Sequence, residues 1–385
     1  MVMKRRKNVY CEMEFLRIFT QNRPEVHGPR DRKLAKAWDN LYDFLCKADL
    51  VLNITKDEFQ KEYDHNEWLQ DLWKFSTNGN CGLVFHTDNF VYLNQLNSTN
   101  IKEELLNAVY LSTSEEGLCQ EKSKEYGVIA MNIETYANCE HLYKDKGTTL
   151  PRGEKGNWSF MEHLNLDFPQ LKFCNTLILA DKYIFKSNSH GQTYKDKVDS
   201  NLRPILNFIL PSKLADGLVF QMIVVTGERY EEYKEQYDYL CDIVHDLRPD
   251  LAYKLTMCNS EKFDFHDRSI ATNNVWIDCP HGFDVFMSGK EANLSATTKV
   301  LIAFPLIQNF SDQVDDSYLA FIKDVKDVIY KTKDGLYKYG DRNPDNHVIS
   351  YYTKRESVDV TQLKAGDKLP LYMIECNKRK KRNFF

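Results

Sequence analysis

The stretch that decides the fold class runs from residue 175 to residue 185 and reads NTLILADKYIF. Its apolar centre predicts a buried strand that ends at a polar tip, and the run LVFQMIVVTG at 218–227 has the same form. The sequence predicts a short amphipathic helix over 202–209, between these strands, and a longer helix over 230–247. Strands that alternate with helices predict a largely parallel sheet covered by helices, with functional residues gathered at the strand ends.

A histidine and an arginine lie two residues apart in the stretch FHDRSIATNNVWI at 265–277. In an extended strand, residues i and i+2 point to the same face, so we expect His266 and Arg268 to project into one site. Such a pair is suited to hold a phosphate. The alternative is a solvated strand face that carries both side chains by chance.

The order of these motifs resembles the phospholipase-D-like domain at the C-terminus of proteins that carry a microtubule-interacting-and-trafficking domain, and its bacterial relatives. The resemblance covers roughly residues 174–287 and implies a mixed α/β sheet flanked by helices. It rests on the strand tip DKYI at 181–184, the helix start NLR at 201–203, the strand end Thr226, the segment HDR at 266–268, the strand residue Trp276 and the turn GFDVF at 282–286.

The resemblance also implies a chemistry. Active phospholipase-D enzymes use the pattern His-x-Lys-x-x-x-x-Asp twice, because one His attacks phosphorus and the other protonates the leaving group. The matching catalytic positions here are His266, Arg268 and Asn273, and the sequence contains no second copy. Arg binds phosphate through a bidentate fork, but a neutral Asn supplies no carboxylate. The resemblance therefore implies binding of a phosphodiester or a lipid headgroup rather than cleavage, unless a homodimer supplies a second His266.

The N-terminal half repeats the alternation of strands and helices. Its mixture of apolar runs and helical periodicity predicts a second α/β domain with a mostly parallel sheet. Strands are predicted at 8–12, 50–54, 83–85, 90–93, 108–113 and 127–131, and helices at 33–47, 56–63 and 115–126.

Acidic residues follow three of these predicted strands. They are Glu12 after the first strand, Glu58 or Glu62 after the second, and Glu115 or Glu116 after the strand at 108–113. Because the ends of parallel strands converge, such carboxylates can share a hard cation, and we expect Mg²⁺ or Mn²⁺. The alternative is that Glu58 and Glu115 complement a helix dipole, which favours acidic residues in the first turn of any helix.

Residues 8–136 resemble the PIN-domain nucleases. The resemblance rests on Glu12 at the end of the first strand, on Glu58 or Glu62 after the second, and on the run LSTSE at 111–115 that leads through a helix to GVI at 127–129. Glu stands where the family has Asp at the first and third acidic positions. The resemblance implies a Rossmann-like sheet and metal-dependent hydrolysis of RNA or single-stranded DNA, in which carboxylates hold a metal that activates water.

The length and net charge of the chain limit the number of domains and the kinds of partner that we expect. The 385 residues exceed one typical core, and we expect a first domain at 1–143, a linker or mobile loop at 144–170 and a second domain at 171–385. The net charge of −5 argues against a general nucleic-acid coat. Each of the basic clusters near the two termini is most simply a solvated terminus, and the alternative is attraction to phosphate or a membrane surface. The first is KRRK at 4–7, and the second is Lys378, Arg379, Lys380, Lys381 and Arg382.

The ten cysteines are scattered without zinc-ligand spacing, and the chain has no signal peptide or apolar run of membrane-spanning length. The simplest interpretation is a cytoplasmic protein whose thiols are reduced.

The leading hypothesis is a metal-dependent nuclease whose degenerate phospholipase-D-like half binds the phosphodiester, as in bacterial or antiviral defence systems. Two alternatives stay open: a non-catalytic protein that binds phosphate or a membrane headgroup, and a metal-independent phosphodiesterase assembled across a homodimer.

Overall fold

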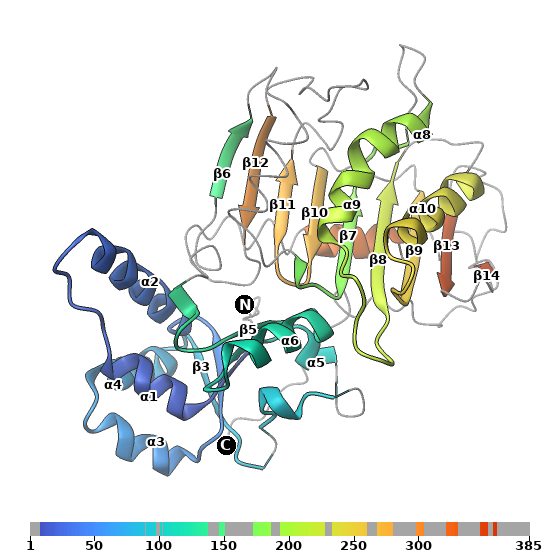
Figure 1. The fold of residues 1–385 in the computed structure, drawn as a ribbon. Coiled ribbons are helices and arrows are strands. Elements are labelled where there is room, and N and C mark those ends of the chain that lie inside the picture. The colour runs from blue at the N-terminus through green and yellow to red at the C-terminus, as the bar shows by residue number, and fades with distance from the viewer. Residues whose placement is uncertain are drawn as a thin grey trace. The chain divides into compact units, whose positions relative to one another are not determined.

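The chain folds into two compact units (Figure 1). The computed structural model describes residues 8–88, 90–97, 101, 103–137, 146–150, 172–185, 193–227, 233–259, 268–279, 298–303, 321–329, 347–352 and 357–359. Unit 1 comprises Met1–Asp145 and Phe304–Asp316, and unit 2 comprises Lys146–Ala303 and Ser317–Phe385. The first boundary falls close to the predicted one, but Lys146–Leu150, inside the predicted linker, forms a strand of unit 2.

Unit 1 is built on an all-parallel sheet of five strands in the order β3-β2-β1-β4-β5. The predicted Rossmann-like α/β fold of the N-terminal half is therefore confirmed. The strands are β1 (Asn8–Cys11), β2 (Asp49–Leu52), β3 (Gly82–Phe85), β4 (Val109–Leu111) and β5 (Ile129–Met131).

Helices cover this sheet because successive strand residues alternate between its faces. Val9 and Cys11 of β1 join the core beneath α1 (Met13–Gln21), α2 (Pro29–Leu45), α3 (Lys56–Tyr63) and α4 (Glu67–Thr77). Tyr10, between them, stacks on Tyr110 at 5.4 Å, and the Tyr110 hydroxyl donates to a carbonyl of α5 (Glu103–Leu106). The remaining helices of this unit are α6 (Glu116–Tyr126) and the 3₁₀ helix η1 (Leu93–Gln95).

Unit 2 contains a mixed sheet of nine strands in the order β14-β13-β9-β8-β7-β10-β11-β12-β6. Three central strands, β7, β8 and β9, are parallel, and the other pairs are antiparallel. The mixed sheet predicted for this half is confirmed. Its strands are β6 (Lys146–Leu150), β7 (Thr176–Ala180), β8 (Phe220–Thr226), β9 (Tyr253–Asn259), β10 (Arg268–Thr272), β11 (Trp276–Cys279), β12 (Thr298–Ala303), β13 (His347–Tyr352) and β14 (Ser357–Asp359).

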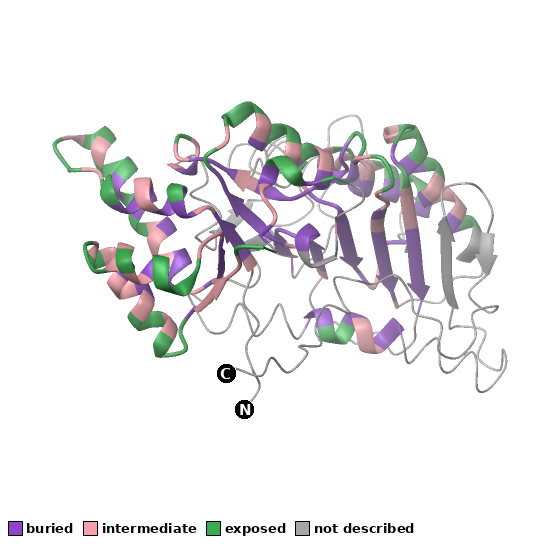
Figure 2. Cartoon of the chain, turned by 90° about the horizontal axis from the view of Figure 1, so that it is seen from below, coloured by how far each residue is buried: buried purple, intermediate pink, exposed green. Residues whose placement is uncertain are grey.

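Helices α9 (Arg203–Ile209) and α10 (Tyr233–Leu247) lie over the parallel strands of unit 2 (Figure 1). Apolar residues of both helices form one buried core with alternate residues of the sheet, including Leu179 and Val224. Figure 2 shows these strands as almost wholly buried and the helices as exposed on their outer sides. Two short segments, α8 (Tyr194–Lys197) and the π-helical turn η4 (Val198–Leu202), lead into α9.

Several local predictions differ from the structure. Residues 90–93, predicted as a strand, run into the 3₁₀ helix η1 instead. Helices α1 and α4 were not predicted: α1 starts directly after β1, with no turn residue to mark its start. Within the described residues, no helix is both long and apolar enough to cross a bilayer.

Candidate sites at the carboxyl ends of the two sheets

The strand order of unit 1 reverses between β1 and β4. The chain passes from β1 outward to β2 and β3, and then returns to form β4 on the other side of β1. Open parallel sheets bind their ligands at such a reversal, outside the carboxyl ends of the strands. The residues at this place are Glu12, which follows β1, and Ser112 and Thr113, which follow β4.

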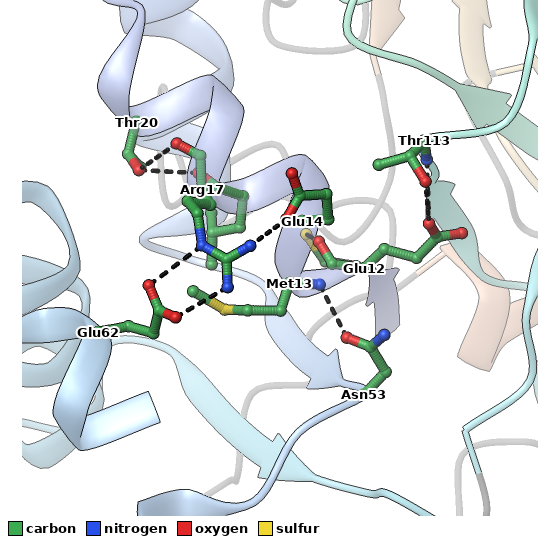
Figure 3. Close-up of polar contacts among 10 residues, drawn as sticks. Glu12, Met13, Glu14, Arg17, Thr20, Asn53, Glu62 and Thr113 are labelled. Atoms are coloured by element: carbon green, nitrogen blue, oxygen red, sulfur yellow. Dashed lines mark hydrogen bonds and ion pairs between the residues drawn. The ribbon is translucent and has the colours of Figure 1, made fainter. Parts of the chain in front are cut away.

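Glu12 is held by the two hydroxyl residues across the reversal. The Ser112 hydroxyl donates to Glu12 Oε1 at 2.6 Å, and Thr113 donates to Oε2 through its hydroxyl at 2.6 Å and its backbone N–H at 3.1 Å. Figure 3 shows the Glu12 side chain reaching Thr113 across this edge. Ser112 is buried, whereas Thr113 is exposed, so the carboxylate lies at the boundary between core and solvent.

Polar groups from the neighbouring strand ends surround Glu12. Asn53, just after β2, accepts the backbone N–H of Met13 at 2.8 Å (Figure 3). Its side-chain amide also donates to the Tyr92 hydroxyl at 3.0 Å. Ser114 lies 2.8 Å from Ser112, hydroxyl to hydroxyl, and its carbonyl accepts the side-chain amide of Asn132, which follows β5. Four strands thus contribute oxygen-bearing side chains to one edge.

Two of the other carboxylates predicted for a metal, Glu58 and Glu62, have separate partners. Glu58 forms a capping box with Thr55 at the start of α3, and hydrogen bonds from the Thr55 backbone and side chain lower the pKa of Glu58. Glu62 accepts two bonds from Arg17, at 3.1 Å and 2.8 Å, which lower the pKa of Glu62. Glu115 is the N-cap residue of α6 and makes no capping bond with its side chain.

The structure therefore does not assemble the predicted set of Glu12, Glu58, Glu62 and Glu115. Across the part of the chain that is described, no three His, Cys, Asp or Glu side chains are grouped so that they could hold a metal ion. The sequence pattern misled because an acidic residue near a helix start also serves as a cap or as half of an ion pair, as Glu58 and Glu62 do here. Of the predicted set, Glu12 follows β1, and Glu115 begins α6 after the returning strand β4.

Unit 2 has a comparable reversal beside β7. The chain passes from β7 to β8 and β9, and then returns to β10 on the other side of β7. Asp181, just after β7, lies 3.5 Å from Arg268 Nε at the start of β10, and the Arg268 guanidinium covers the Tyr183 ring at 5.0 Å. Asp181 is buried, but the Arg268 side chain is 20 % exposed.

Asn273, one of the positions matched to a phospholipase-D motif, does not lie beside Arg268. Asn273 follows the opposite end of β10, where its buried Oδ1 accepts the backbone N–H of Asn175 at 3.0 Å. Five residue-to-residue steps along the strand separate Arg268 from Asn273, about 16 Å. Asn273 therefore has a structural role at the amino end of β7. His266 lies outside the described residues, as do Lys378, Arg379, Lys380, Lys381 and Arg382.

Sequence reasoning missed the hydroxyl partners of Glu12 and the carboxylate beside Arg268. The signal was present in both cases, because polar residues follow an apolar strand directly in the runs YLSTS and LILAD. No family model matches this chain, and no curated protein matches it.

Proposed function

We propose that unit 1 hydrolyses phosphodiester bonds in RNA or single-stranded DNA, with Mg²⁺ or Mn²⁺ held at Glu12. The observation that carries the proposal is the position of Glu12: it is a carboxylate at the reversal of a parallel sheet, with hydroxyl groups of the next strand directly beside it.

The donor set fits a hard cation. A carboxylate has about four lone-pair positions, and three of those on Glu12 accept the bonds from Ser112 and Thr113. The fourth, on Oε1, remains for a metal. Mg²⁺ binds through one or two carboxylates with water and substrate phosphates, so a full cage of protein ligands is not required. When bound, such an ion polarises the phosphoryl group and lowers the pKa of its water.

The chain itself then has a positioning role. The bonds from Ser112 and Thr113 fix the carboxylate of Glu12 in one orientation without neutralising its charge. The buried position of Ser112 keeps this arrangement rigid, and the exposure of Thr113 leaves the site open to a strand of nucleic acid.

The test is cleavage of fluorescent single-stranded RNA, single-stranded DNA and duplex DNA by the full chain, in Mg²⁺, in Mn²⁺ and in EDTA. We expect cleavage in metal that EDTA abolishes, and a loss of about 100-fold or more in Glu12→Gln, the scale of removing one group that stabilises the transition state. Glu14→Gln is the matched control, because Glu14 lies two residues away on α1 and pairs with Arg17. Cleavage by Glu12→Gln at the wild-type rate contradicts the proposal.

Arg268 favours a second candidate function, binding of phosphate without turnover. Its guanidinium is partly exposed at the carboxyl edge of the parallel strands and stacks on Tyr183, an arrangement suited to a phosphodiester. This candidate predicts that the protein retains labelled RNA but cuts nothing, and that Arg268→Gln weakens retention whereas Arg203→Gln, on α9, does not. Cutting that survives EDTA and disappears in His266→Ala would instead support a phosphodiesterase assembled across a dimer.

A further inference from the structure

A row of polar residues crosses the carboxyl edge of the parallel strands in unit 2. Thr226 and Asn259 are register partners at the ends of β8 and β9. Ala180 pairs with Val225 and with Ser269, so one step outward Asp181 lies beside Thr226 on one side and Arg268 on the other. The order across the sheet is Asn259, Thr226, Asp181, Arg268.

All four side chains share one face of the sheet. Residues two positions further into each strand, Leu179, Val224, Met257 and Ile270, belong to the core beneath α9 and α10. Because side chains alternate along a strand, the polar row continues that same face beyond the apolar core. A face that is apolar elsewhere therefore ends in a carboxamide, a hydroxyl, a carboxylate and a guanidinium.

Asn259 is the exceptional member of the row. Its side chain is 1 % exposed, and among the residues that the structure describes neither Nδ2 nor Oδ1 has a hydrogen-bond partner. Buried amides in native proteins are almost always paired, because an unpaired donor or acceptor loses its bonds to water without replacement. An apolar residue at this position would avoid that cost, so the amide indicates a ligand.

The amide also restricts the chemistry of that ligand. An Asn side chain offers a donor and an acceptor side by side, and it is fully satisfied by a planar group that presents an acceptor and a donor in the same arrangement. Nucleobase edges have this property, as in the bidentate pairing of Asn with adenine. A phosphate presents acceptors only and would leave Oδ1 unpaired.

The side chains at the two ends of the row differ in solvent exposure. Arg268 is 20 % exposed, whereas Asn259 is closed from solvent. We infer that this row is a nucleotide-binding site, in which Asn259 reads the base and Arg268 binds the phosphate. Asp181 and Thr226, between them, suit the hydroxyl groups of a pentose. Three strand spacings separate the ends, about 14 Å between backbones, a span that the Arg268 side chain and one nucleotide fill.

This inference rests on the phosphate-binding role proposed for Arg268 and is independent of the Glu12 centre. The experiment is calorimetric titration of the full chain, in EDTA, with the four nucleoside 5′-monophosphates, ribose 5-phosphate, inositol 1-phosphate and inorganic phosphate. We expect at least one nucleotide to bind about tenfold or more tightly than ribose 5-phosphate. Asn259→Leu removes that preference, and Arg268→Gln weakens ribose 5-phosphate and the nucleotides alike.

Gln221→Leu is the matched control. Gln221, near the amino end of β8, also has a buried Oε1 without a hydrogen-bond partner among the described residues, but it lies at the opposite edge of the sheet. We expect it to leave nucleotide binding unchanged. Without ligand, Asn259→Leu should raise the Tm by about 2–4 °C, because an orphan amide is replaced by an apolar group of similar size.

The outcomes separate the parts of the inference. Ribose 5-phosphate binding that is lost in Arg268→Gln, without any preference for a nucleotide, overturns the role of Asn259 and leaves the phosphate site. Tighter binding of inositol 1-phosphate than of every nucleotide overturns the ligand class. Unchanged nucleotide preference in Asn259→Leu, or in Asn259→Ser if the first variant does not fold, overturns the assignment of the base-reading residue.

Discussion

Arg17 and Glu62 form a bidentate ion pair that ties α1 to α3, and Glu14 joins the pair from the same helix as Arg17 (Figure 3). Two parallel N–H···O bonds between a guanidinium and a carboxylate are stronger than hydrogen bonds between neutral groups. Both side chains are about one-third exposed, so solvent screens the pair and its contribution to stability is about 1 kcal/mol at most.

The pair gives unit 1 a stability that depends on pH. Hydrogen bonds from Arg17 hold the pKa of Glu62 below the ordinary value of about 4.3. A lowered folded-state pKa means that the contribution is complete above the ordinary value and is lost as the pH falls through the folded-state value. We expect Glu62→Gln to lower the Tm at pH 7, and the difference from wild type to shrink as the pH falls below the ordinary value of the Glu62 pKa, in thermal melts over an acid series. Glu134→Gln, an exposed carboxylate, is the control, and a Tm difference that stays constant as the pH falls would contradict the pair's role.

The same residue-scale reasoning explains which part of the site the sequence predicted. Glu12 follows β1 directly, and strand-end position was enough to select it. Glu58 and Glu62 also follow a predicted strand, yet Glu58 hydrogen-bonds to Thr55 and Glu62 pairs with Arg17. Partners 45 residues apart, such as Arg17 and Glu62, are decided by how α1 and α3 pack, which no local pattern contains.

At the scale of elements, α6 shows how local sequence ends a helix. Gly127 is its C-cap residue, with φ of 62° in the left-handed region, and β5 begins two residues later. A side chain in this conformation is strained, which is why Gly is favoured at helix C-termini. The predicted helix over 115–126 is confirmed, and the strand predicted over 127–131 is present but begins at Ile129.

Two glycines of α6 provide a matched pair of substitutions. Gly127→Ala should lower the free energy of unfolding by about 1–2 kcal/mol because of the left-handed backbone. Gly117→Ala, in the first turn, should raise it by up to about 1 kcal/mol because Ala has the higher helix propensity. An added Cβ at Gly117 meets no atom of the described chain within 4 Å. Urea denaturation measures both, and equal effects from the two substitutions would contradict the assignment of the cap.

Two segments without such signals were predicted wrongly. Helix α1 begins at Met13 straight after Glu12, so its start carries no glycine, proline or capping hydroxyl. The segment at 90–93 has the composition of a strand, but Phe90 and Tyr92 pack edge to face beside Tyr10, and the chain turns into η1. Tertiary packing overrides strand propensity at this place.

At the scale of the whole molecule, the two units use the same arrangement on different sheets. In each unit, three consecutive parallel strands are added side by side on one side of the sheet. The next strand then pairs with the free side of the first of the three. A carboxylate follows that first strand, Glu12 in unit 1 and Asp181 in unit 2, and it contacts the strand that returns. Glu12 in unit 1 accepts hydrogen bonds from hydroxyl groups, whereas Asp181 in unit 2 lies beside a guanidinium. Carboxylates at similar positions therefore have different partners in the two units.

The cysteines provide a test of both cores at once. Eight of the ten are described, all as free thiols, and seven of these eight are buried. Burial raises the pKa of Cys11 in unit 1 and of Cys174 in unit 2, which disfavours the reactive thiolate. We expect both to resist maleimide in the native protein and to react promptly in guanidinium chloride, as measured by peptide mass spectrometry. Native modification of either at the denatured rate would show that its core is not formed.

Local sequence patterns predicted the α/β class, the alternation of strands and helices in both halves, Glu12 as a strand-end residue and Arg268 as a residue on a strand. These properties follow from local periodicity and strand length, which neighbouring residues alone encode. Only the tertiary structure decided the strand order, and with it the contact of Glu12 with Ser112, the separation of Asn273 from Arg268, and the row that joins Arg268 to Asn259. Pairing between distant strands depends on how complete faces pack, so residues far apart in sequence become neighbours without any local signal.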